Sequence, residues 1–137
     1  MYSRGHALLS LLIGLAIVLV APTPVHPVLV LVVVVAIGVG IDFDHFLLAM
    51  ALTGSTKNVR RVLGNPTMVL FDQTEIFDEG DLTEAQRLLS HVVIAGVAVA
   101  GLWVVARYWA LVVAVTLYVH VLADLYADVR AELSAGG

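Results

Sequence analysis

The sequence contains no cysteine and very little charge. Without cysteine, the chain has no disulfide framework, no thiolate metal ligand and no cysteine nucleophile. Only 13% of its residues are charged and 61% are hydrophobic, so it has too few polar side chains to cover a soluble domain of this size. The small net charge of −4 gives no sign of nucleic-acid binding. We therefore expect a protein whose solvent is the lipid bilayer.

Four apolar segments predict an all-α membrane protein built as a bundle of four transmembrane helices. The predicted helices cover about residues 5–21, 27–52, 83–106 and 109–128. Each is near the ~20 residues that a spanning helix needs. Their valine content does not favour strands, because a single spanning segment in lipid must satisfy its backbone hydrogen bonds internally. We expect a single integral membrane domain, residues 1–137, with a polar loop at about residues 53–82.

Local signals mark where these segments begin and end. The prolines of residues 22–27 predict a tight turn between the first two helices, and Arg107–Trp109 another between the last two. Thr83 followed by Gln86 predicts a capping box that opens the third helix. Arg4 followed by an apolar stretch is also typical of signal peptides. However, the residues around Ala21 are a poor site for signal-peptide cleavage, so we expect the first segment to be retained as a membrane anchor.

Lysine and arginine favour one end of the predicted bundle. The end that carries the two short turns has only Arg107. The end that carries both termini and the long loop has Arg4, Lys57, Arg60, Arg61, Arg87 and Arg130. Since positively charged loops stay in the cytoplasm, this six-to-one bias predicts a multi-pass protein of the cytoplasmic membrane with both termini cytoplasmic.

Ionisable residues from all four segments fall in one layer near the cytoplasmic edge. Each of the following lies fifteen residues from the turn end of its segment: His6, Asp42, His91 and Asp124. At the helical rise per residue, this distance is about 22 Å for all four. His120 lies one turn deeper, and His45 and Asp128 lie about one turn shallower. We therefore expect these side chains to converge in the interior of the bundle.

Residue type and helical spacing indicate a metal site. Asp42 and His45 are spaced i,i+3, and His120, Asp124 and Asp128 form an i,i+4,i+8 stripe, so each set shares a helix face. Ionisable groups in spanning helices are costly and face the bundle interior, and imidazole with carboxylate suits zinc, manganese or iron. A bound cation would also offset the carboxylate repulsion. The predicted metal ligands are His6, Asp42, His45, His91, His120 and Asp124.

The ordered set of motifs resembles the family of membrane-bound metal-dependent hydrolases, which have a distant likeness to zinc-dependent phospholipases C. The matching elements are His6, Asp42-Phe43-Asp44-His45, Arg87-Leu88-Leu89-Ser90-His91 and His120-Val121-Leu122-Ala123-Asp124. The chain departs from the family pattern at Ile41, where proline is usual, at Gln86, where a histidine is usual, and at Val92, where serine is common. Loss of that histidine implies one metal fewer or altered chemistry.

A divalent metal, with zinc as the first choice, could activate a water that attacks an ester. We expect the substrate to be a phosphoester of a lipid or of another membrane-associated molecule. Arg87 is the candidate for holding a phosphate oxygen, and Asp44 or Asp128 for the general base.

Two other classes of function remain open. The same His/Asp cluster could serve metal or proton transport or sensing, although the third and fourth segments hold only Thr116 and Tyr118 as further polar candidates deeper than His120. Alternatively, the cluster could hold the helices together by hydrogen bonds alone. In the loop, the acidic residues are expected to be solvated, and the apolar stretch of residues 68–71 to rest on the membrane or to cover the site.

Overall fold

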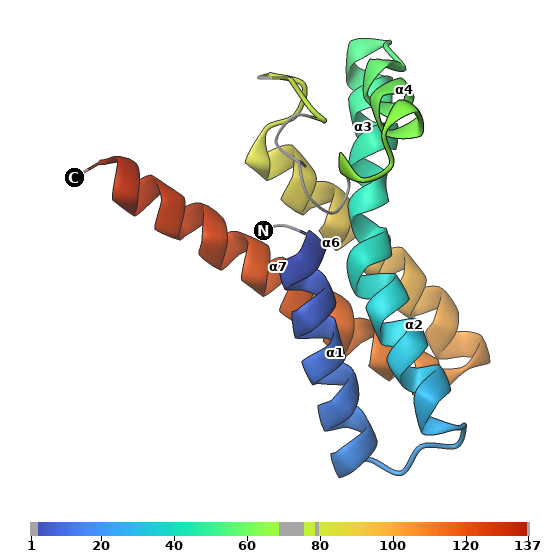
Figure 1. The fold of residues 1–137 in the computed structure, drawn as a ribbon. Coiled ribbons are helices and arrows are strands. Elements are labelled where there is room, and N and C mark those ends of the chain that lie inside the picture. The colour runs from blue at the N-terminus through green and yellow to red at the C-terminus, as the bar shows by residue number, and fades with distance from the viewer. Residues whose placement is uncertain (1–2, 69–75, 79, 137) are drawn as a thin grey trace.

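The computed structural model describes residues 3–68, 76–78 and 80–136, and these residues form helices and connecting segments without any strand (Figure 1). The predicted all-α class is confirmed. The helices in chain order are α1 (Ser3–Val20), α2 (Pro27–Gly40), the 3-10 helix η1 (Ile41–Phe43), α3 (Asp44–Thr53), α4 (Lys57–Gly64), α6 (Glu84–Val105) and α7 (Arg107–Ala135).

Within the described part of the chain, three helices are long and apolar enough to cross a membrane, which indicates a membrane protein. They are the continuous rod of α2, η1 and α3, and the helices α6 and α7. The apolar helix α1 is shorter than these three. Helix α2 begins at Pro27, and proline suits this position because the first N–H of a helix has no partner within the helix. The exposed side chain of His26 caps the helix by accepting a hydrogen bond from the Val28 N–H.

The helices pack as two antiparallel hairpins. Helix α1 packs along α2, α6 packs along α7, and α7 also contacts both α1 and α2. The α1–α2 and α6–α7 connections lie at one end of the molecule, whereas α3 and α4 lie at the other (Figure 1). The side chains of Val30, Val34 and Val112 form a small core between the hairpins. This packing brings α1, η1 and α7 to one place.

The last hairpin differs from its predicted bounds. Helices α6 and α7 are separated by Ala106 alone, and α7 begins at Arg107 rather than after a turn at Arg107–Trp109. Helix α7 also continues to Ala135, beyond the predicted end at residue 128. The apolar pattern stops there, but the following residues are good helix formers with no glycine or proline before Gly136. The capping box is confirmed at Thr83, whose hydroxyl accepts from the Gln86 N–H.

Ion pairs connect α4 to the segment before α6. Lys57 contacts both Asp78 and Asp81 at 2.8 Å, and Arg61 contacts Asp78 at 2.7 Å. Hydrogen bonds from Lys57 and Asn58 lower the pKa of Asp81 to about 2, so this carboxylate stays ionised at neutral pH. The expectation that all loop acids are solvated is wrong for Asp81, which is buried because α4 supplies its partners.

Other expectations for the loop cannot be compared with the structure. The apolar patch at residues 68–71 lies outside the described residues except for Met68, and so do Asp72, Glu75 and Glu79.

Helices α1 and α2 approach each other closely at Gly38. A Cβ on Gly38 would overlap the hydroxyl of Ser10 and lie 2.9 Å from the Ser10 Cβ, so a hydroxyl rotation could not relieve the clash. Ser10 lies one turn from His6, and Gly38 one turn from Asp42. The contact between Ser10 and Gly38 therefore sets how near His6 and Asp42 come to each other.

We predict that Gly38→Ala destabilises the protein relative to Gly40→Ala by about 1–3 kcal/mol, the usual cost of overpacking. Both substitutions gain the same helix propensity, but a Cβ on Gly40 meets no atom within 4 Å. Thermal unfolding of both variants in one detergent measures the difference. Equal stability would contradict a close contact between α1 and α2.

Candidate metal centre

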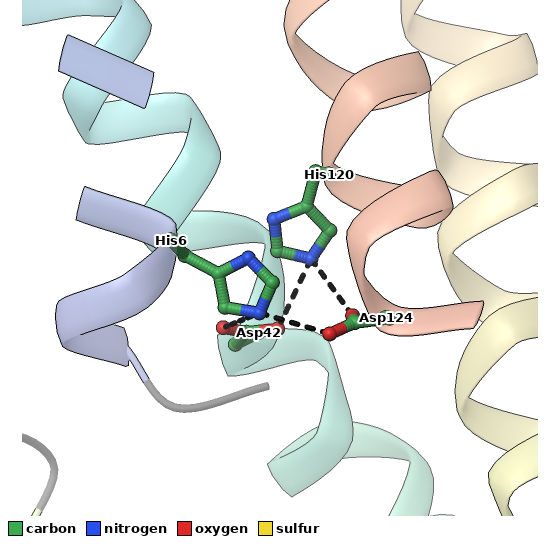
Figure 2. A group of neighbouring side chains, drawn as sticks. All are labelled: His6, Asp42, His120 and Asp124. Atoms are coloured by element: carbon green, nitrogen blue, oxygen red, sulfur yellow. Dashed lines mark ion pairs between the residues drawn. The ribbon is translucent and has the colours of Figure 1, made fainter. Parts of the chain in front are cut away.

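Four side chains from three segments point toward one position (Figure 2). They are His6 of α1, Asp42 of η1, and His120 and Asp124 of α7. The two histidines are almost completely buried, with 1% and 2% of their surface exposed. The four residues form a group that could hold a metal ion.

Two of the four nitrogen–oxygen distances within this group match the spacing of ligands around one small cation. His6 Nε2 lies 3.0 Å from Asp124 Oδ1 and 4.0 Å from Asp42 Oδ2. His120 Nε2 lies 3.4 Å from Asp42 Oδ1 and 3.3 Å from Asp124 Oδ2. Ligands bound tetrahedrally at 2.0–2.1 Å would be about 3.4 Å apart, whereas a charge-assisted N–H···O bond measures about 2.7–2.9 Å. The two His120 spacings therefore fit shared coordination better than direct hydrogen bonds.

A second group that could hold a metal consists of Asp42, His45 and His91. His91 Nε2 lies 3.3 Å from Asp42 Oδ1, and its ring stacks on that of His45 with centroids 4.8 Å apart. Asp42 thus belongs to both groups. All six predicted metal ligands lie in this one cluster, which His91 and His120 connect with ring centroids 5.0 Å apart.

Backbone and carboxylate contacts fix how the His120 and His91 rings present their nitrogens. His120 Nδ1 lies 2.9 Å from the Gly38 carbonyl, which can only accept, so Nδ1 carries a proton. His91 Nδ1 lies 3.1 Å from Asp44 Oδ2 and donates in the same way. When neutral, both rings therefore aim an Nε2 lone pair at the Asp42 carboxylate. Lone pairs repel carboxylate oxygens unless a proton or a cation lies between them.

The charge of the cluster favours either a bound cation or protonated imidazoles. Asp42, Asp44 and Asp124 are three carboxylates in the interior of the bundle, and each is at most partly accessible. Four histidines surround them, so with neutral rings the cluster carries three negative charges. Burying that much like charge without compensation is strongly unfavourable.

The structure brings Asp44 into the cluster, although an ideal α-helix would point it away from Asp42. The reason is η1, where the rod tightens into a 3-10 turn at Ile41–Phe43. Asp42 and Asp44 then contact opposite nitrogens of His91. Asp44 Oδ1 also lies 3.5 Å from His45 Nε2. Gly38 and Gly40 just before Asp42 were the sequence signal for an irregular helix here.

The remaining predicted site residues are placed less centrally. Arg87 lies one turn before His91 on α6, and its buried Nε has no hydrogen-bond partner among the described residues. Asp128 is half-buried one turn beyond Asp124 and belongs to neither metal-binding group. Sequence reasoning missed the Gly38 carbonyl, because a backbone acceptor for His120 leaves no trace in residue identity.

Comparison of the chain with protein-family models, with curated proteins and with solved structures finds no match.

We predict that Asp124→Asn lowers the metal affinity of the protein by at least about tenfold. Substitution of residues that only support metal ligands already lowers metal affinity by about this factor, so loss of a ligand should cost at least as much. The amide keeps the shape but loses the negative charge that lies against His6 and His120. Bound metal per chain and thermal stability should be measured together in detergent. If Asp124 were only a packing partner, the variant would keep its metal and lose at most roughly 1 kcal/mol of stability.

Proposed function

We propose that the chain spans the cytoplasmic membrane four times with both termini in the cytoplasm. Helix α1 is 18 residues long, about 27 Å at the helical rise per residue, which is close to the ~30 Å hydrocarbon core. It packs along α2, which begins the continuous rod Pro27–Thr53 that is long and apolar enough to cross a membrane. The six-to-one distribution of lysine and arginine supports the orientation.

Single cysteines test this topology without background, because the chain has none of its own. Thr23→Cys should react with a membrane-impermeant maleimide applied to intact cells. Ser134→Cys should react only after the cells are permeabilised. The opposite pattern would invert the orientation, and external labelling of both positions would place an even number of spans between them instead of the proposed three.

We propose further that the cluster is the active site of a metal-dependent hydrolase that cleaves an ester, and specifically a phosphoester, at the membrane. The observation that carries this proposal is the set of imidazole nitrogens and carboxylate oxygens spaced for one cation. His6, Asp42, His120 and Asp124 would hold it. A divalent cation there supplies Lewis acidity, which acidifies water and polarises a phosphoryl oxygen.

The other residues of the cluster have distinct proposed roles. Because Asp44 contacts His91 Nδ1, we propose that it positions this ring and does not act as the general base. Arg87 would bind a phosphate oxygen with the guanidinium that its neighbours leave partly unpaired. Asp128 is then the carboxylate left to accept a proton from water. This arrangement agrees with the resemblance to membrane-bound metal-dependent hydrolases.

A transport function is less well supported, because the interior on the turn side of the cluster is mostly apolar. Val30, Val34, Val112 and Leu117 are buried there. The buried polar side chains described on that side are Ser10 and Thr116, and the Thr116 hydroxyl donates to the Val112 carbonyl at 2.8 Å. Two hydroxyls supply too few ligands to carry an ion, which leaves hydrolysis or sensing as the better-supported functions.

We predict that the zinc-loaded protein in detergent cleaves bis(para-nitrophenyl) phosphate. His120→Asn should lower kcat by at least about 100-fold, because removing a direct metal ligand should reduce activity more than removing a residue that only supports a ligand. The matched control is His26→Asn. His26 is the exposed cap of α2, and asparagine is also a good N-cap, so activity should be unchanged. Equal activity of both variants, or no metal-dependent turnover by the wild type, would reject the enzyme and favour sensing.

A further inference from the structure

A short stretch of the loop between α4 and α6 lies against the histidines of the cluster. The Phe77 ring meets the His45 ring edge-on, with centroids 6.3 Å apart and an interplanar angle of 79°. His45 in turn stacks on His91, whose Nε2 lies 3.3 Å from Asp42 Oδ1. The side chain of His45 is only 12% exposed. Phe77 therefore covers the cluster on the side of His45.

Apolar contacts place this stretch but are few. The Phe77 ring packs against that of Phe46 on α3, with centroids 5.1 Å apart, and the neighbouring Ile76 is 2% exposed. Three residues can bury only a small apolar area, and segments with few buried apolar contacts open locally before the rest of a fold does. Residues 76–78 therefore need further contacts to stay in place.

Arg61 of α4 supplies those contacts on both sides of Phe77. Its Nη1 donates to the Ile76 carbonyl at 3.2 Å and contacts Asp78 Oδ1 at 2.7 Å. Lys57 adds a contact to Asp78 at 2.8 Å. The position of Phe77 over His45 thus depends on ion pairs that α4 makes with the loop.

The ion pairs at Asp78 differ from those at Asp81 in their exposure. The side chains of Asp78, Arg61 and Lys57 are between 37% and 48% exposed, so the pairs at Asp78 are weak and are screened by salt. Asp81 is buried and accepts from the Asn58 amide at 2.9 Å. The contacts at Asp78 should therefore break while Asp81 remains attached to α4.

We propose that residues 76–78 form a cover that opens and closes over the His45 side of the cluster, and that Arg61 holds this cover closed. Loops that cover a site commonly control entry and exclude water. The other histidines of the cluster lie on helices α1, α6 and α7, which cannot move aside as easily. The cover itself does not depend on the proposed chemistry, and only its role in admitting a phosphoester rests on the proposed function.

Diethyl pyrocarbonate, which modifies accessible imidazoles, reports on the cover without any turnover. Mass spectrometry of the purified protein in detergent can follow all five histidines in one sample. Arg61→Gln should speed the modification of His45 about fivefold, which is the largest effect expected from losing an exposed ion pair. Phe77→Ala should speed it at least as much, because it removes the covering ring. Added salt should speed it in the wild type, since salt screens the exposed pairs.

The matched control is Arg60→Gln, at the next residue of α4. Arg60 is exposed and makes none of the contacts that hold residues 76–78, so the rate at His45 should be unchanged. In every sample, exposed His26 gives the rate of an open histidine, and the almost completely buried His6 and His120 report unfolding.

Equal rates at His45 in the Arg60 and Arg61 variants would overturn the proposal. So would a rise at His45 that is matched at His6 and His120, because Arg61 would then stabilise the whole fold and not a cover. Asp78→Asn serves as a second variant if Arg61→Gln does not fold. Selective opening at His45 without metal-dependent hydrolysis would reject the proposed function alone. Hydrolysis with equal rates at His45 would reject the cover alone.

Discussion

The carboxylate of Asp42 is shared by imidazoles from two different helices, and the arrangement of the site depends on that sharing. Asp42 Oδ1 lies 3.3 Å from His91 Nε2 and 3.4 Å from His120 Nε2. The other nitrogens of both rings are held by Asp44 and by the Gly38 carbonyl. The histidines therefore cannot turn away, and the electrostatic conflict around Asp42 has to be resolved by protons or by a bound cation.

The fold serves this contact through close helix approach and one local irregularity. Gly38 lets α1 come near enough for His6 to face Asp124. The 3-10 turn of η1 turns Asp42 and Asp44 onto the same ring. Both features lie in the same short stretch of the Pro27–Thr53 rod, which is long and apolar enough to cross a membrane. The close approach of α1 at Gly38 and the 3-10 turn of η1 together assemble the polar cluster.

Much of this could be anticipated from the sequence, since hydropathy and helical rise are simple to apply in a membrane. That His6, Asp42, His91 and Asp124 lie close together could be anticipated by counting residues from the turn end of each helix. Asp44 could be anticipated only as a candidate general base, because its contact with His91 depends on a 3-10 turn that glycine permits but does not require. The length of α7 was missed because the end of an apolar segment need not be the end of a helix.

X-ray absorption spectroscopy of the metal in the purified protein tests the central claim most directly. The account predicts one or more stoichiometric metal ions with a first shell of nitrogen and oxygen at about 2.0–2.1 Å if the metal is zinc, and the outer-shell scattering of at least two imidazoles. Protein without stoichiometric metal even after loading, or a metal surrounded by oxygen alone, would contradict it. The cluster would then be a network of imidazolium–carboxylate pairs that holds the helices together.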